Sequence, residues 1–227
     1  LGAQNEETWF KGIKRLLPAH NLEYSDGEIT ISKYWSYPEQ TISTSFEDAK
    51  EEYIEIFQKA VKIRMRSDVP VGTTLSSGLD SSSIVSVLRK FYSNEHKTFT
   101  AKFDKKDYKK TEKKIYKEDI EIDEAKLVAR LANDLDLKAH FIEIQDENFI
   151  SQLNSNIYYL ESGHASPATI PLSNILNYAK DHVTVVMEGQ GADELLGGYI
   201  SSAFPFFILD NLKNGNLANS IDEIKKF

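Results

Sequence analysis

The sequence predicts an α/β fold with a doubly wound parallel sheet. Short apolar strands alternate along the chain with segments of amphipathic, helical spacing, which is typical of parallel sheets. Two of these strands run directly into turns of small and acidic residues, and ligands bind at the carboxyl ends of strands in open sheets of this kind. The length of 227 residues and the hydrophobic share of 41% allow one packed domain with an appendage.

Composition excludes several classes of protein. The sequence has no run of about 18 apolar residues, so we expect no membrane-spanning helix. Cysteine is absent, which excludes disulfides and thiolate metal sites. The formal net charge of −8 argues against general nucleic-acid binding. No signal-peptide pattern opens the chain, so we expect a cytoplasmic enzyme that binds neither nucleic acid nor membrane.

The first 40 residues predict a hairpin rather than the start of a domain. Leu22–Tyr24 and Ile29–Ile31 alternate apolar and polar residues, and Asp26-Gly27 between them is a typical hairpin turn. Two strands cannot bury their own apolar face, so we expect this segment to need a sheet that the chain does not contain. The alternative is an N-terminal extension that folds onto its own domain.

The first motif follows a helix that the spacing predicts over residues 45–66, with Ser45 as its cap. It runs over Ser76–Ser82, between an apolar strand and a helix expected over residues 81–92. Small residues let backbone N–H groups approach an anion at a helix N-terminus, and serine hydroxyls can donate as well. Asp80 would repel a phosphate unless a cation lay between them, which suggests Mg²⁺. The alternative is an ordinary strand–turn–helix with serine caps.

The middle of the chain predicts further strands and helices. Acids suit the dipole at a helix start, which is a sufficient reason for Asp123 and Glu124. The lysine-rich residues 104–122 are either a solvated loop or a lid over a bound nucleotide. Strands are expected over residues 98–103 and 140–144, and helices after Asp123-Glu124 and over residues 147–160 and 171–180.

The second motif, Glu188–Tyr199, follows a strand expected over residues 183–187. That strand is apolar and β-branched, as a central parallel strand should be. Gly189 and Gly191 permit a close approach of the backbone, and Asp193 is a candidate for a second Mg²⁺ ligand facing Asp80. The alternative is a glycine-rich connector with a capping aspartate.

Both motifs resemble those of one enzyme family. Ser76–Ser81 is similar to the SGGxDS pyrophosphate loop of the ATP pyrophosphatases, and residues 188–199 resemble the SGEGxDExxGGY signature of the glutamine-hydrolysing asparagine synthetases. Residues 12–20 resemble the GIKxLxPGH segment near the end of that family's glutaminase domain. The resemblance implies a PP-loop synthetase domain of the adenine nucleotide alpha hydrolase type over residues 41–227, truncated at its C-terminus. Residues 1–40 would be the C-terminal remnant of a glutamine amidotransferase domain, with a linker.

The resemblance also implies an activity. The family amidates a carboxylate, here most simply aspartate to asparagine, through an acyl-adenylate, and splits ATP into AMP and pyrophosphate. ATP and Mg²⁺ are the implied cofactors. Ammonia would come from a glutaminase domain in the longer protein, because the family's N-terminal cysteine nucleophile is absent here. The polar residues 161–167 correspond to part of the carboxylate pocket, and a homodimer is left open.

The site residues that the resemblance implies lie in the two motifs and in one strand. Asp80, Glu188 and Gln190 take the catalytic positions, and Asp80 and Asp193 take the metal positions. The implied nucleotide-binding residues are Leu75, Ser76, Gly78, Asp80, Ser81, Ser82, Ala101, Glu188 and Gly189.

Four positions depart from the family pattern. Ser77 stands for the first glycine of the pyrophosphate loop, which matters if the backbone there needs a positive φ. Ala19 replaces a glycine in the first segment, Glu188 replaces a serine near the adenine, and Gln190 replaces the central acid. A glutamine cannot act as a base, although Glu188 shares a face with it on an extended segment. Two alternatives therefore stay open, namely amidation of another carboxylate (a sugar acid, or closure of a β-lactam-type ring) and a nucleotide-binding protein without activity.

Overall fold

The computed structural model describes residues 5–40, 42–92, 96–103, 124–144, 148–161, 166 and 168–215. The chain divides into two compact units. The first comprises Leu1–Arg66, Ala101–Glu121 and Ile142–Asp181. The second comprises Ser67–Thr100, Ile122–Phe141 and His182–Phe227, and it contains both sequence motifs. The described residues include no helix that is both long and apolar enough to cross a membrane.

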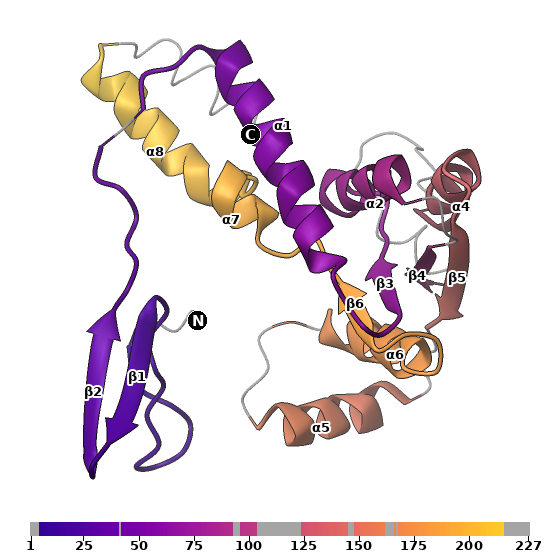
Figure 1. Cartoon of the computed structure of the whole chain (residues 1–227), viewed down its shortest axis with the longest axis horizontal. Helices are drawn as coiled ribbons and strands as arrows, with labels where there is room; N and C mark the ends of the chain where they lie inside the picture. The colour runs from indigo at the N-terminus through magenta and orange to yellow at the C-terminus, as the bar shows by residue number, and fades with distance from the viewer. Residues whose placement is uncertain are drawn as a thin grey trace. The chain divides into compact units, whose positions relative to one another are not determined.

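The first unit contains the predicted hairpin. Strands β1 (His20–Ser25) and β2 (Glu28–Lys33) pair in antiparallel register and form a sheet of two strands (Figure 1). Asp26 and Gly27 at the turn have φ of 52° and 87°, as a tight hairpin turn requires. Every residue of β2 is exposed, so the hairpin buries neither of its faces in this chain. The predicted hairpin is confirmed.

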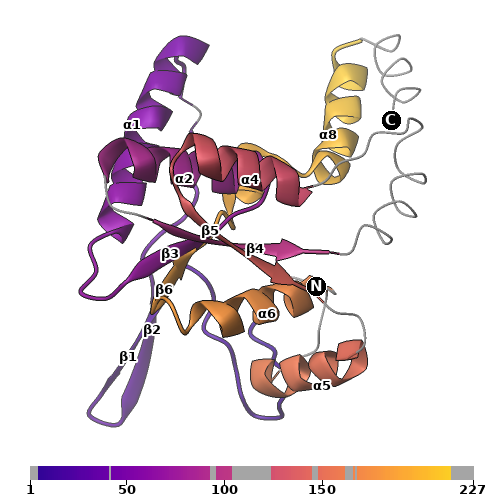
Figure 2. The same cartoon turned by 90° about the vertical axis from the view of Figure 1, so that its right-hand side faces the viewer.

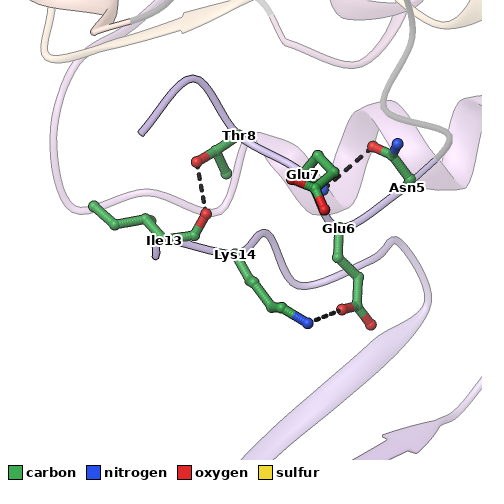
Figure 3. A network of polar contacts seen from close by, with 6 residues as sticks. All are labelled: Asn5, Glu6, Glu7, Thr8, Ile13 and Lys14. Atoms are coloured by element: carbon green, nitrogen blue, oxygen red, sulfur yellow. Dashed lines mark hydrogen bonds and ion pairs between the residues drawn. The ribbon is translucent and has the colours of Figure 1, made fainter. Parts of the chain in front are cut away.

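A short polar network precedes the hairpin. The Thr8 hydroxyl donates to the carbonyl oxygen of Ile13 at 2.6 Å, and Lys14 Nζ donates to Glu6 Oε2 at 3.0 Å (Figure 3). The bond to Glu6 raises the pKa of the Lys14 ammonium. Both side chains are exposed, so this ion pair contributes little to stability.

Three helices complete the described part of the first unit. In α1 (Phe46–Arg64), the Ser45 hydroxyl accepts from the N–H of Asp48 at 3.1 Å, which confirms the predicted cap. Its apolar face is largely exposed, and Val61 is its buried residue. Helices α5 (Phe149–Leu160) and α6 (Thr169–Ala179) pack together.

Within the described residues, the second sheet has four strands in the order β5-β4-β3-β6. They are β3 (Val71–Thr74), β4 (Lys97–Lys102), β5 (Lys138–Glu143) and β6 (Val185–Met187). Strand β3 pairs in parallel with β4 on one side and with β6 on the other. The chain therefore adds strands on one side of β3 and then returns to its other side, which is the reversal of a doubly wound sheet. The predicted fold class is confirmed.

One expectation about the sheet is wrong. We expected the strand before the second motif to be central, but β6 has β3 as its neighbour and lies at the edge of the four-stranded sheet. It also begins at Val185, two residues later than expected, and Val185 is 38% exposed. The apolar, β-branched composition therefore predicted a strand but not its position in the sheet, because an edge strand can still bury one face.

Helices α2 (Leu79–Phe91) and α4 (Glu124–Asp134) lie on the same face of the sheet (Figure 2). They meet in a buried cluster of Leu75, Val85 and Val128, and three leucines pack around it. Phe91, the last residue of α2, is exposed. Short α7 (Ala192–Leu196) and α8 (Ile200–Lys213) follow β6.

Candidate active site

The loop after β3 is held by its own serines. The N–H of Ser76 donates to Ser81 Oγ at 3.0 Å, and the Ser81 hydroxyl donates to the Ser76 carbonyl oxygen at 3.2 Å. The N–H of Gly78 donates to Ser76 Oγ at 3.2 Å. Ser81 is buried and holds the loop from the inside, whereas Ser76 lies on the exposed side of the loop. The chain thus turns tightly from β3 into α2.

This turn leaves the N-terminus of α2 open. Gly78 is the N-cap residue and makes no side-chain capping bond. The first N–H groups of a helix have no intrahelical acceptor, and the helix dipole adds partial positive charge there. Ser77 is not among the described residues with positive φ, so the serine in place of a glycine causes no backbone strain. The geometry suits an anion such as a phosphate.

The second motif approaches the same helix end. Gly189 follows β6, and a Cβ atom built on it would lie 3.0 Å from Asp80 Cβ and 3.1 Å from the backbone nitrogen of Ser81. The two motifs, which are far apart in the sequence, therefore meet at the point where β3 and its neighbour β6 end. This is the point at which the strand order of the sheet reverses, where open α/β sheets bind ligands.

Carboxylates gather beside this helix end. Tyr199 Oη donates to Glu194 Oε1 at 3.0 Å. This bond raises the pKa of the Tyr199 phenol, and the negative charges of Glu194, Asp193 and Asp80 raise it further. One hydroxyl therefore senses both Asp80 and Asp193, which come from the two different motifs. Both carboxylates therefore lie within electrostatic range of Tyr199, and their binding of one metal ion stays a prediction.

The donor set of this neighbourhood fits Mg²⁺ only together with a ligand. Asp80 and Asp193 offer hard carboxylate oxygens, which Mg²⁺ prefers. The described residues contain no group of three or more His, Cys, Asp or Glu that could hold a metal by themselves. Mg²⁺ in nucleotide sites is commonly held by one or two carboxylates, water and phosphate oxygens, so two carboxylates beside an anion site are sufficient.

Asp193 has a fixed place in its turn. A Cβ atom built on Gly198 would lie 1.8 Å from Asp193 Oδ1, so the carboxylate lies directly against a glycine backbone. The N–H of Gly198 also donates to the Asp193 carbonyl oxygen at 3.0 Å. A side chain at position 198 would therefore require the Asp193 carboxylate to turn away from its present place.

The remaining predicted residues lie on the strand ends and the second motif. Leu75 is buried, and Thr100 Oγ1 donates to its carbonyl oxygen at 2.7 Å. Ala101 lies in β4 immediately after Thr100. Glu188 is half-buried after β6, whereas Gln190 is exposed. Ser82 is half-buried in the first turn of α2, where its hydroxyl donates to the Leu79 carbonyl oxygen at 3.0 Å.

Two side chains in this region were not singled out from the sequence. Tyr199 ends the second motif and bonds Glu194, as described above. Glu124 begins α4 and accepts hydrogen bonds from Ser77. In the sequence the helix dipole is a sufficient reason for Glu124, and no local pattern indicates its contact with a loop 47 residues earlier.

Two sequence predictions lie outside the described residues. The lysine-rich segment 104–122 falls wholly outside them. Of the polar residues 161–167, Glu161 and Ser166 are described. The lid and the carboxylate pocket proposed for these segments remain predictions.

Comparison with known proteins identifies the family. The asparagine synthase family profile matches residues 52–221, which include both motifs. The chain belongs to the asparagine synthase family. It is 35% identical over 188 residues to glutamine-hydrolysing asparagine synthetase 1 of Bacillus subtilis (strain 168), a match that covers 82% of this chain and 27% of that protein. The resemblance predicted from the two motifs is confirmed.

Other relatives carry different names. The chain is 29% identical over 221 residues to amidase chyE of Penicillium rubens, covering 85% of this chain and 30% of that protein. An NH3-dependent NAD synthetase from Campylobacter jejuni aligns in structure with a TM-score of 0.37 and 20% identity, over 69% of this chain and 62% of that one. The chain spans about a third of the length of the curated relatives it matches.

Proposed function

We propose that this chain provides the ATP-dependent half of a ligase that amidates a carboxylate, with aspartate as the first candidate substrate. The observation that carries the proposal is the contact of Gly189 with Asp80 and Ser81 at the uncapped start of α2. It combines an anion site, two carboxylates and a close backbone approach at the end of neighbouring strands. Membership of the asparagine synthase family supports the same chemistry.

In this proposal the loop from Ser76 to Ser82 binds the β- and γ-phosphates of ATP. The N–H groups at the start of α2 and the serine hydroxyls stabilise the charge that develops on pyrophosphate as it leaves. The substrate carboxylate attacks the α-phosphorus, the bond to pyrophosphate breaks, and ammonia then displaces AMP from the acyl-adenylate. Binding both reactants in line supplies much of the acceleration, since the protein forms no covalent bond itself.

Asp80 and Asp193 would hold Mg²⁺, which when bound neutralises phosphate charge. The adenine would lie against main-chain groups near Leu75, Ala101 and Gly189. Glu188 and Gln190 would contact the reacting end of the substrate. Glu188 is half-buried after β6 and is the titratable member of this pair, so it is our candidate for accepting a proton from the incoming amine.

The proposal divides the chain in two. Residues 1–40 would be the end of a glutaminase domain with its linker, and residues 41–227 would belong to the synthetase domain. The hairpin supports this division because all of its β2 residues are exposed and it has no third strand to pair with in the described chain. The glutaminase domain of the longer protein would supply the ammonia.

A second candidate keeps the adenylation but changes the acceptor. Gln190 is exposed and uncharged at a position where the family pattern has an acid, and Glu188 carries the charge two residues earlier. This change alters the part of the site expected to meet the substrate amine. The similarity to a protein named an amidase adds weight to a carboxylate other than aspartate.

The deciding experiment measures the release of AMP and pyrophosphate by the full-length protein. The reaction contains ATP, Mg²⁺, ammonium and aspartate, with an aspartate-free control. Release that requires aspartate supports asparagine synthesis. Release with a different carboxylate supports the second candidate. ATP binding without release in the presence of any carboxylate tested would contradict both.

A further inference from the structure

The loop after β3 is tied to a second helix as well as to its own serines. The N–H of Ser77 donates to Glu124 Oε1 at 3.1 Å, and the Ser77 hydroxyl donates to the same oxygen at 3.4 Å. One carboxylate oxygen therefore receives two donors from a single loop residue. Bonds to a charged acceptor are stronger than those between neutral groups, so this contact can define the position of Ser77.

The core fixes the position from which Glu124 reaches the loop. Glu124 is the first residue of α4, and Val128 lies four residues later on the same helical face. Val128 is fully buried against Leu75 and Val85. Because Ser77 comes two residues after Leu75, the packing of one turn of α4 sets the preceding turn beside the loop. The core thereby places the start of α4 beside the loop, and the contact itself is made at the surface.

The contact also gives a role to the residue that departs from the family pattern. A glycine at position 77 would offer the N–H alone, whereas Ser77 adds a hydroxyl donor to the same oxygen. Ser77 needs no positive φ, so the serine costs no backbone strain here. The substitution therefore strengthens the link between the loop and α4.

We propose that Glu124 is a positioning residue for the phosphate-binding loop. It holds Ser77 by its N–H and hydroxyl together and so keeps the loop in the conformation that leaves the start of α2 open to a phosphate. The proposal rests on the proposed function, because it concerns the affinity of the same loop for ATP. Glu124 has no part in the chemical step and acts through Ser77.

The test compares two substitutions of Glu124 in the whole chain. The dissociation constant of ATP with Mg²⁺ is measured by calorimetry well below the unfolding temperature. Glu124→Ala removes the acceptor and is expected to weaken binding about 10-fold. Glu124→Gln keeps an acceptor oxygen and is expected to remain within about 3-fold of the parent chain. Asp134→Asn, at the exposed other end of α4, removes the same charge and should change nothing.

Ser77 completes the test. Ser77→Ala should weaken binding less than Glu124→Ala, because the N–H donor stays, and the double variant should be no weaker than Glu124→Ala alone. Additive losses would overturn the proposal. So would unchanged affinity in Glu124→Ala, or tighter binding in Glu124→Gln, which would mean that the carboxylate competes with the phosphate.

A second readout separates this proposal from the function on which it rests. Hydrogen exchange of the backbone amides over residues 75–80 needs no nucleotide. Glu124→Ala should speed exchange there at least about 10-fold, with residues 82–91 of α2 and with α8 unchanged, and Glu124→Gln should stay close to the parent. If the parent chain binds no ATP, the proposed function fails, and this exchange alone decides the positioning role. The positioning role would be overturned if Glu124→Ala sped up exchange throughout the unit, or if it left exchange over residues 75–80 unchanged.

Discussion

The two ends of the parallel strands differ in whether certain polar and charged groups have partners within the protein. Beside the start of β4, two polar side chains are paired: His96 Nε2 shares a hydrogen bond of 2.8 Å with Thr73 Oγ1, and Lys97 Nζ donates to the His182 carbonyl oxygen at 3.2 Å. After the strands, α2 begins without a side-chain cap, and Asp80 and Asp193 form no ion pair with another described residue. A folded protein keeps such unpaired groups where a ligand completes them.

The comparison predicts that substitutions after the strands change activity and those before them change stability. The largest effect is expected for Asp80→Asn. Removing a residue that only hydrogen-bonds to a metal ligand typically lowers metal affinity or activity about 10- to 100-fold. Removing the ligand itself should therefore lower Mg²⁺-dependent pyrophosphate release at least about 100-fold. The free energy of unfolding should stay within about 1 kcal/mol, because Asp80 loses only its interaction with the helix dipole.

The measurement pairs an activity assay with urea unfolding. Asp210→Asn, an exposed carboxylate in α8, is the matched control and should change neither quantity. If Asp80→Asn kept its activity, the metal role of Asp80 would be wrong. If Asp80→Asn unfolded the unit, the Asp80 carboxylate would be needed for stability, and the two strand ends would no longer differ in this respect.

Two glycines give the next largest effect and sharpen the contrast. A Cβ on Gly72 would lie 2.6 Å from Phe99 Cε2, inside the sheet, where Phe99 is fully buried and cannot give way. Gly72→Ala should therefore cost about 3 kcal/mol of stability. Gly189→Ala meets Asp80 and Ser81 at 3.0 Å and 3.1 Å, and should weaken ATP binding about 10-fold while the fold is kept.

The check is calorimetric affinity beside chemical unfolding for both variants. Equal losses of stability would show that Gly189 is a packing residue like Gly72. Unchanged affinity in a folded Gly189→Ala would remove the observation on which the proposed function depends most.

Features set by local sequence could be predicted, whereas features set by packing between distant residues could not. The hairpin, α1 and the parallel sheet follow from local spacing and turn chemistry, and these predictions are confirmed. Helices α7 and α8 were not predicted, and the phosphate-binding role of the loop after β3 stays a prediction. The edge position of β6 was missed because one strand's composition reports burial and not its neighbours. The contact of Glu124 with Ser77 was missed because it depends on how Val128 packs in the core, which no local pattern contains.

His96 is expected to make stability depend on pH. Burial lowers the pKa of its imidazole, so the unfolded chain takes up a proton more readily than the folded one. Stability contributed by this group is therefore full above the ordinary pKa near 6.5 and is lost as the pH falls from there towards the lowered pKa of the folded state. His96→Gln should lower the free energy of unfolding by about 1–2 kcal/mol at pH 8, because the hydrogen bond with Thr73 is lost. The free energy of unfolding of this variant should then decrease less than that of the parent as the pH falls.

Urea unfolding at several pH values between 5 and 8 tests this, with His20→Gln in the hairpin as the control. An unchanged slope in His96→Gln would assign the pH dependence to other groups. A change in ATP affinity without a change in stability would contradict the division between the two strand ends.

The smallest effect concerns two threonines of β4. Both are buried, but Thr100 Oγ1 donates to the Leu75 carbonyl oxygen at 2.7 Å, whereas Thr98 Oγ1 has no hydrogen-bond partner among the described residues. Thr98→Val replaces an unsatisfied hydroxyl by a methyl group and should raise the free energy of unfolding by about 1 kcal/mol. Thr100→Val should lower it by about 1 kcal/mol, because it leaves the Leu75 carbonyl oxygen without this donor. Opposite signs in urea unfolding would support the hydrogen-bond assignment, and a loss of stability in both would mean that Thr98 is already satisfied.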